Sequence, residues 1–426
     1  MKQFLFFAFA LLFSASLLTA QNTATTTQTG NANNLGATQT GSVLTLTANQ
    51  TGDGNASLTT QLGGTNSMTV DQAGNMNSLE ATQNGNNLTL TSNQAGNDNT
   101  VTTSQTGNTN DITLDQTGSG NILNTTQSGS LSAITSNQLG DGNRVVTTQN
   151  GSSNSMTIDQ IGNGNGVSGW TSDVQNGSNL STTIRQEGDG NGSAIRQNSN
   201  SSFNTINVVQ IGNDNRGELF DQQANASGNS IDAQITGNSN RTLMRQFTNS
   251  HNNTMTGITA GNNNDMRLFQ NNGASNNSTN SSILGDNNYF GVQQNEDGYG
   301  STLTGTIVGN DNYIFAKQSD GTGHTASLTV TGDNNEMNLL SLAGGAGNTG
   351  NRVTASQEGS ENDLLMTFDA GVNSDMTVTQ TGDMNQAELI SNGANNATTL
   401  TQDGIGHMAN STQNGIGNTT TITQNQ

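Results

Sequence analysis

A glutamine returns every 11 residues through the first part of this chain, and this spacing limits its fold more than any other feature. The row is unbroken at Gln28, Gln39, Gln50, Gln61, Gln72, Gln83, Gln94, Gln105, Gln116, Gln127, Gln138, Gln149 and Gln160. Glycine follows nearly every one of them two positions later, and asparagine follows most of them five positions later. So strict a period predicts one small structural unit stacked many times, not a compact globular domain.

Within each unit the side chains alternate between two kinds. In segment 66–72 the even-numbered residues are Asn, Met, Val and Gln, whereas the odd-numbered residues are Ser, Thr and Asp. Segments 77–83, 110–116 and 154–160 show the same alternation. A period of two predicts a β-strand, here of about seven residues. The Gly- and Asn-rich stretches between these segments predict tight turns, because both residue types accept positive φ angles.

Eleven residues accommodate one strand and one turn, so 22 residues predict one coil of two strands that face each other. Leu44, Leu88 and Ser132 replace the first Asn of a strand at intervals of 44 residues, or two coils. One set of strands carries inward residues that alternate in size, and the facing set stays small. We therefore predict an all-β fold, a two-sheet β-solenoid of stacked strand-turn-strand coils of about 22–24 residues, with a thin filled core.

Stacking places each amide side chain over its equivalent, about 4.8 Å away along the axis. Amides at this spacing form hydrogen-bonded ladders, which satisfies polar groups that would be costly to bury alone. The predicted inward assembly ladder consists of Gln50, Asn55, Gln61, Asn66, Met68, Val70, Gln72, Asn77, Leu79, Gln83, Asn110, Ile112, Leu114, Gln116, Asn154, Met156, Ile158 and Gln160. The Asn and Gln content is also typical of disordered low-complexity segments, but the strict spacing argues against that interpretation.

The chain divides into three parts. In residues 1–20, Lys2 is followed by an apolar run and then by small residues, which is typical of a secretory signal peptide cleaved near Ala20. An N-terminal membrane anchor is the alternative. Residues 21–197 hold the regular 11- and 22-residue repeats. The regular spacing is interrupted between Gln160 and Gln175, an interval that contains Trp170, and we interpret it as a bulged loop with the indole on the outer face. A binding role for Trp170 is the alternative.

Residues 198–426 hold degenerate repeats of the same solenoid. Their period is about 24 residues, and we interpret this longer period as two turns that have each grown by one residue. Gln402, Gln413 and Gln424 return to the 11-residue spacing, and the whole chain after residue 20 predicts about 17 or 18 coils. The repeats run close to both ends, so we expect no polar cap and an edge that can template another chain.

The composition excludes several classes of function. The chain has no Cys, which removes disulfides and thiolate chemistry, and no Pro, which suits continuous β structure. Its formal net charge of −21 disfavours nucleic acid and anionic lipid as partners. No catalytic arrangement is evident, and we expect no cofactor. His251, His324 and His407 are expected to be solvated turn residues.

Acidic residues suggest two further roles, one in metal binding and one in solubility. Asp53, Asp141 and Asp189 stand in Gly-Asp-Gly-Asn turns similar to calcium-binding nonapeptide repeats, but the period differs, so we expect no metal site. The outward Asp111, Asp115 and Asp159 are expected to slow premature aggregation by like-charge repulsion.

The motif Gln-x-Gly-x-Gly-Asn recurs at 50–55, 138–143, 160–165 and 186–191. It resembles the curlin repeat, and the resemblance covers nearly all of the chain after residue 20. It implies an extracellular structural subunit of a curli-like amyloid fibre, used in biofilm matrix, cell adhesion and aggregation. It also implies export through a dedicated secretion pore with its chaperones, and seeding by a nucleator subunit. The chain is longer than usual fibre subunits, which leaves a major, minor or nucleating role open.

Two alternatives come from the outward residues. Thr pairs such as Thr45 and Thr47 could form a flat array of the kind that ice-binding solenoids use, although charged residues such as Glu80 and Arg144 interrupt the outer faces. A monomeric β-solenoid adhesin that binds a ligand through its irregular loops is the other alternative. No segment after residue 20 has the length of an apolar membrane span.

Overall fold

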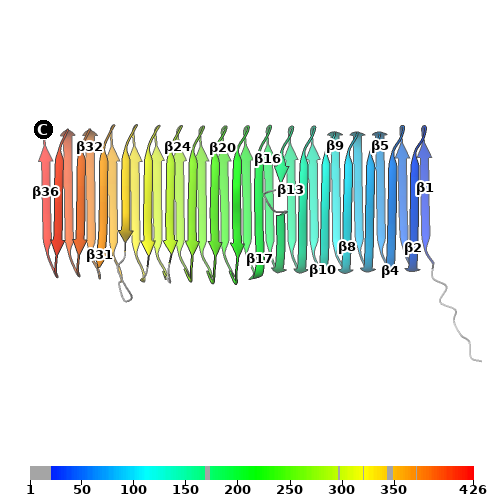
Figure 1. The fold of residues 1–426 in the computed structure, drawn as a ribbon, viewed down its shortest axis with the longest axis horizontal. Helices are drawn as coiled ribbons and strands as arrows, with labels where there is room; N and C mark the ends of the chain where they lie inside the picture. The colour runs from blue at the N-terminus through cyan, green and yellow to red at the C-terminus, as the bar shows by residue number, and fades with distance from the viewer. Residues whose placement is uncertain (1–20, 168–172, 296–297, 320, 343–348, 371) are drawn as a thin grey trace, which may run out of the picture.

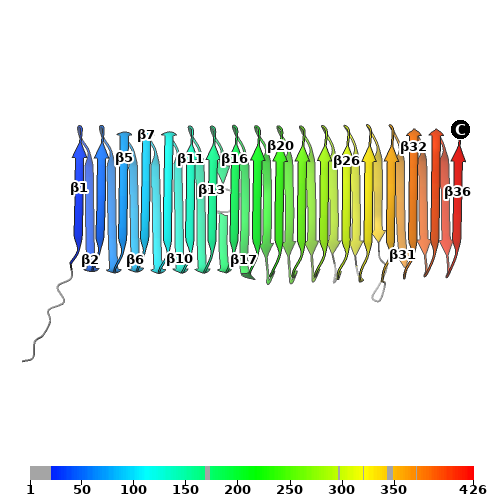
Figure 2. The same cartoon turned by 180° about the vertical axis from the view of Figure 1, so that it is seen from behind.

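The computed structural model describes residues 21–167, 173–295, 298–319, 321–342, 349–370 and 372–426. The predicted signal peptide at 1–20 and Trp170 lie outside these residues. The described residues form a straight rod of β-strands that lie across its long axis, with β1 at one end and β36 at the other (Figure 1). The view from behind shows the same arrangement (Figure 2).

The strands form two sheets. Sheet A contains β1 (Thr23–Thr29), β3 (Thr45–Thr51), β5 (Ser67–Asn75), β7 (Thr89–Asn97), β9 (Asp111–Ser119), β11 (Ala133–Leu139), β13 (Ser155–Ile161), β16 (Ser181–Glu187), β18 (Thr205–Ile211), β20 (Ser230–Thr236), β22 (Thr254–Ala260), β24 (Ser278–Leu284), β26 (Thr302–Val308), β28 (Thr325–Thr331), β30 (Arg352–Glu358), β32 (Asp375–Asp383), β34 (Ala397–Ile405) and β36 (Thr419–Asn425). Sheet B contains β2 (Asn34–Ser42), β4 (Ala56–Gly64), β6 (Ser78–Asn86), β8 (Thr100–Asn108), β10 (Ile122–Ser130), β12 (Arg144–Ser152), β14 (Gly166–Val167), β15 (Asp173–Ser178), β17 (Gly192–Ser202), β19 (Arg216–Gln223), β21 (Arg241–Phe247), β23 (Asp265–Asn271), β25 (Tyr289–Asn295), β27 (Tyr313–Ser319), β29 (Glu336–Leu342), β31 (Asp363–Ala370), β33 (Gln386–Asn392) and β35 (Met408–Asn414).

The chain alternates between the sheets, and every pairing within a sheet is parallel. β5, for example, pairs with β3 on one side and β7 on the other, so that Met68 lies beside Leu46 and Leu90. β14 and β15 are two pieces of one position in sheet B, because both pair with β12 and with β17. The structure thus confirms the predicted two-sheet β-solenoid, with about 17 coils of about 22 residues.

The additional residues of the longer coils lie in one of the two turns. Strands β20 and β21 start at Ser230 and Arg241, which is the strand spacing of the regular repeats. Strand β22, however, starts at Thr254, two positions later than that spacing would place it. The interpretation that both turns grew by one residue is therefore wrong. The added residues make a bridge column of their own, which includes Ser227 and His251 and continues through the equivalent residues of later coils. Lengthening only this turn keeps the other turn and its asparagine column in register.

The core is filled by large residues opposite small ones, and the two sheets exchange these roles along the rod. In the regular part, sheet A supplies buried large residues such as Leu114 and Ile158, and sheet B supplies Thr103 and Thr125. Farther along, the large residues come from sheet B. The facing positions of sheet A hold small residues there, namely Ala233, Gly257, Ser281 and Gly305. The exchange preserves a thin, filled interior throughout.

Candidate functional site

Buried glutamines form continuous ladders along the rod. The Nε2 group of Gln50 donates to Oε1 of Gln72 across 2.8 Å and to the carbonyl oxygen of Asn34 across 3.1 Å. Both glutamine side chains are at most 2% exposed. Each amide therefore accepts from the preceding coil and donates to the following one, so that the ladder has a direction.

The glutamine ladders differ in length between the two sheets. In sheet B the ladder runs without a break from Gln39 to Gln318. In sheet A it runs from Gln28 to Gln210 and resumes from Gln357 to Gln424. Between these stretches the same sheet A column contains Ile235, Thr259, Ile283, Ile307 and Val330.

Asparagines at the start of the sheet B strands form a second kind of ladder. The backbone N–H and the Nδ2 group of Asn77 both donate to Oδ1 of Asn55, each across 3.1 Å. The same Nδ2 group donates to the carbonyl oxygen of Gly96 across 2.8 Å. One asparagine thus connects the coil before it with the coil after it, and the pattern satisfies polar groups that the turn buries.

The predicted inward residues all lie in the interior of the solenoid. None of them is more than 2% exposed, and the set comprises Gln50, Asn55, Gln61, Asn66, Met68, Val70, Gln72, Asn77, Leu79, Gln83, Asn110, Ile112, Leu114, Gln116, Asn154, Met156, Ile158 and Gln160. The ladders bring together residues that are one coil apart in sequence.

The prediction that the three histidines are solvated is wrong for His324. This side chain is 1% exposed and occupies the column in which other coils place Asn or Ser. Its Nδ1 atom accepts the backbone N–H of Asn351 across 3.3 Å, so that it substitutes for an asparagine oxygen. The sequence did not indicate this because the longer turn of this region hides the register.

The Gly-Asp-Gly-Asn turns use their carboxylates to join the equivalent turns of neighbouring coils. Oδ1 of Asp53 accepts the backbone N–H of Asn31 across 2.7 Å, and the backbone N–H of Asp53 donates to Oδ1 of Asn75 across 2.9 Å. In the part of the chain that the structure describes, no group of three His, Asp or Glu side chains could hold a metal ion. Within the same part, no helix is long and apolar enough to span a membrane.

The two ends of the rod expose strand edges. Among the described residues, β1 pairs only with β3 and β36 pairs only with β34. The interior residues of the last coil are correspondingly less covered, since Ile422 is half-buried whereas Leu400, its neighbour in the same column, is fully buried. The backbone N–H of Ala397 donates to the carbonyl of Asn418, which shows that outward-facing residues of this sheet donate toward the following coil.

Part of the chain matches a known family of repeats. Residues 96–129 match the curlin associated repeat. The matched segment contains strands β8 and β9 and most of β10. No curated protein matches the chain.

Proposed function

We propose that this chain, whose residues 96–129 match the curlin associated repeat, is the structural subunit of an extracellular, curli-like amyloid fibre. Its fold suits a structural role, as does its repeat family, which is not enzymatic. In this proposal the chain adds to others end to end, by pairing of sheet edges, in a biofilm matrix or an adhesive cell-surface layer.

The ladders carry the proposal. Within each ladder every glutamine except the last donates toward the following coil. A coil added at the β36 end would therefore meet donors, and a coil added at the β1 end would meet acceptors. Gln424 already accepts from Gln402 across 2.8 Å, and its own Nε2 group donates to the carbonyl of Met408. A free parallel edge with amides at the β-sheet spacing is a template for another chain of the same kind.

Export and seeding belong to the same proposal. Residues 1–20 would direct secretion, and a curli-type pore, chaperones and nucleator would serve as partners. The net charge of −21 would slow the association of chains in solution before they reach the surface.

The proposal is tested by growth of residues 21–426 at micromolar concentration, followed by fibre length and amyloid-dye fluorescence. Thr421→Pro supplies a sharp variant. The backbone N–H at this position points away from β34, because Thr421 shares the orientation of Thr419, the partner of Ala397. Proline removes that donor while the pairing with β34 stays intact.

We expect seeded growth by the unmodified chain and by the control Thr421→Ala, and a loss of growth at the β36 end by Thr421→Pro. Fibre diffraction should show a spacing of about 4.8 Å along the fibre axis. A folded, β-rich rod that never elongates at any concentration would refute the proposal.

A further inference from the structure

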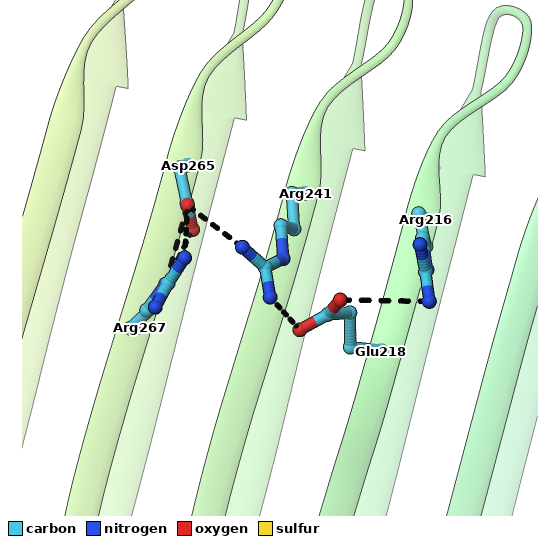
Figure 3. Close-up of polar contacts among 5 residues, drawn as sticks. All are labelled: Arg216, Glu218, Arg241, Asp265 and Arg267. Atoms are coloured by element: carbon cyan, nitrogen blue, oxygen red, sulfur yellow. Dashed lines mark hydrogen bonds and ion pairs between the residues drawn. The ribbon is translucent and has the colours of Figure 1, made fainter. Parts of the chain in front are cut away.

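The outer face of sheet B concentrates the positive charge of this acidic chain. Six of the ten basic residues lie on its strands between β17 and β27. Five of them form a basic band on β17 to β23, namely Arg196, Arg216, Arg241, Arg245 and Arg267, and Lys317 lies farther along on β27. Figure 3 shows part of this basic band, in which side chains from β19, β21 and β23 lie side by side.

The arginines of the basic band outnumber the carboxylates that they contact. Arg241 bridges two strands, since it contacts Glu218 on one side and Oδ2 of Asp265 across 3.3 Å on the other (Figure 3). Arg216 lies 3.6 Å from Glu218, and Arg267 lies 2.7 Å from Asp265. Three guanidinium groups therefore share two carboxylates, which leaves one positive charge unbalanced.

A second pair of arginines repeats this excess deeper in the sheet. Arg196 and Arg245 contact the same carboxylate oxygen of Asp221, across 2.9 and 3.2 Å, and Asp221 is fully buried. Arg245 also covers the ring of Phe247, with 4.3 Å from its guanidinium carbon to the ring centroid. The basic band thus carries two surplus charges on a rigid sheet surface.

The same face carries an acidic band farther along the rod. Glu336 on β29, Asp363 on β31 and Glu388 on β33 line a shallow groove together with Asn338 and Leu365. Two of these carboxylates accept from amides, since Asn338 donates to Glu336 across 2.6 Å and Gln386 donates to Asp363 across 3.1 Å. Within the described ranges these three carboxylates make no ion pair.

Two stacked tyrosines separate the bands. The rings of Tyr289 on β25 and Tyr313 on β27 are 4.7 Å apart and nearly parallel. β23 lies on one side of them, and β29 lies on the other. Along the rod axis, the outer face of sheet B is therefore first basic, then aromatic and then acidic. The tyrosines lie midway between Arg241 and Asp363.

We propose that two copies of this rod pair face to face through sheet B, antiparallel along the rod axis, about a two-fold axis that passes between β25 and β27. This symmetry places Tyr289 of one copy over Tyr313 of the other. It sets the strand of Arg241 opposite that of Asp363, the strand of Arg267 opposite β29, and β19 opposite β33. An isologous contact of this kind needs one surface that is complementary to itself, which a basic-aromatic-acidic order provides.

Charge complementarity favours this arrangement over a parallel one. Parallel pairing would set the arginines of one copy against those of the other, and the unpaired carboxylates against each other. The overall charge of the two rods opposes pairing weakly, since the Debye length is about 8 Å at physiological salt and only charges in contact matter. The eight strands of sheet B from β19 to β33 offer a surface of about 900 Å² per copy. This area is close to that of a standard interface, and its centre is aromatic.

Two charge-reversed variants test the pairing. The first carries Arg216→Glu, Arg241→Glu and Arg267→Glu, and the second carries Glu336→Lys, Asp363→Lys and Glu388→Lys. The control carries Asp71→Lys, Asp115→Lys and Asp159→Lys on the outward face of sheet A. The readout is mass per unit length of individual rods or filaments by electron microscopy, with cross-section by X-ray scattering.

We expect the unmodified chain and the control to show twice the mass per length of a single rod. Each reversed variant alone should show the single value, and their equimolar mixture should regain the double value. That recovery also demonstrates that both variants are folded. Replacing the same three arginines with glutamine removes their charge without reversing it and is a milder test. The proposal would be overturned if the unmodified chain formed single rods, if the reversed variants still paired, or if their mixture stayed single. Binding of an anionic polysaccharide to the basic band without pairing of rods would overturn it as well. Growth in filament length is measured separately from mass per length. A failure of end-to-end assembly would therefore still allow the pairing of single rods to be tested.

Discussion

The ring of Phe290 occupies the space that any side chain at Gly305 would need. A Cβ atom placed on Gly305 would lie 2.1 Å from Cζ of Phe290, which is far inside contact distance. Phe290 belongs to sheet B and Gly305 to sheet A, so that the absence of a side chain on one sheet permits the largest one on the other. Gly257 and Met266 show the same relationship, with 2.7 Å from such a Cβ to the sulfur.

Gly305→Ala should therefore lower the stability of the rod by about 1–3 kcal/mol, because the backbone or the buried ring must move. Adding Phe290→Leu should recover part of this loss, so that the double variant is more stable than the sum of the single effects predicts. Ser281→Ala is the matched control in the same column, since its Oγ has no hydrogen-bond partner. The denaturant midpoints of the four variants measure the coupling between positions 305 and 290. Strictly additive effects of the two substitutions would contradict the predicted coupling.

Breaking one step of a glutamine ladder should be costly although the substitution is small. Gln116 accepts from Gln94 across 3.0 Å and donates to Gln138 across 2.8 Å. Gln116→Ala leaves both partners buried and without this amide, and we expect a loss of about 2–4 kcal/mol. Gln234→Ala, at an exposed position of sheet A, should change the denaturant midpoint little. Equal effects at the two positions would show that the ladder adds no stability.

Much of the fold was predictable because the interior repeats strictly. A buried amide needs an equivalent amide one coil away, so a column such as that of Gln50 and Gln72 appears in the sequence as a fixed interval. The exchange of large and small residues between the sheets was not predictable, because Phe290 with Gly305 fills the core as well as the reverse order does. The charged bands were missed for a different reason. Outward positions obey no packing rule, and only the register reveals that Arg241 and Asp363 share one face.

The two glycines of a single turn should respond very differently to alanine. Gly140 and Gly142 both have positive φ angles, 121° and 65°. A Cβ on Gly140 would lie 2.0 Å from the carbonyl oxygen of Gly162 in the next coil, whereas a Cβ on Gly142 would have nothing within 4 Å. Gly142→Ala should cost about 1–2 kcal/mol, the usual penalty of a left-handed backbone for a side chain. Gly140→Ala adds a backbone clash that no rotamer can relieve.

We therefore expect Gly142→Ala to fold with a slightly lower melting temperature, and Gly140→Ala to lose the coils around β11 and β13. Hydrogen exchange of the amides in these strands separates a local opening from a global one. Similar protection in the two variants would mean that the turns can separate without disturbing the stack.

The stacked tyrosines should make the rod sensitive to alkali. Burial raises the pKa of Tyr289, and the Tyr313 phenol raises it further. Burial also raises the pKa of Tyr313, with a contribution from Glu336. A raised pKa means that the folded chain holds the phenolic proton more tightly than the unfolded chain does. The stability that this provides is complete below the ordinary tyrosine pKa of about 10, and it is lost as the pH rises through the raised values.

The denaturant midpoint should accordingly fall as the pH rises above the ordinary tyrosine pKa of about 10, and the double variant Tyr289→Phe with Tyr313→Phe should flatten this fall. The chain is well suited to this measurement, since it has three tyrosines and no cysteine. Tyr299→Phe serves as the control, because that ring is 53% exposed and lies in the bridge column of the turns. If the double variant loses stability in alkali as steeply as the unmodified chain, ionisation of the stacked pair is not the cause, and deprotonation elsewhere must be.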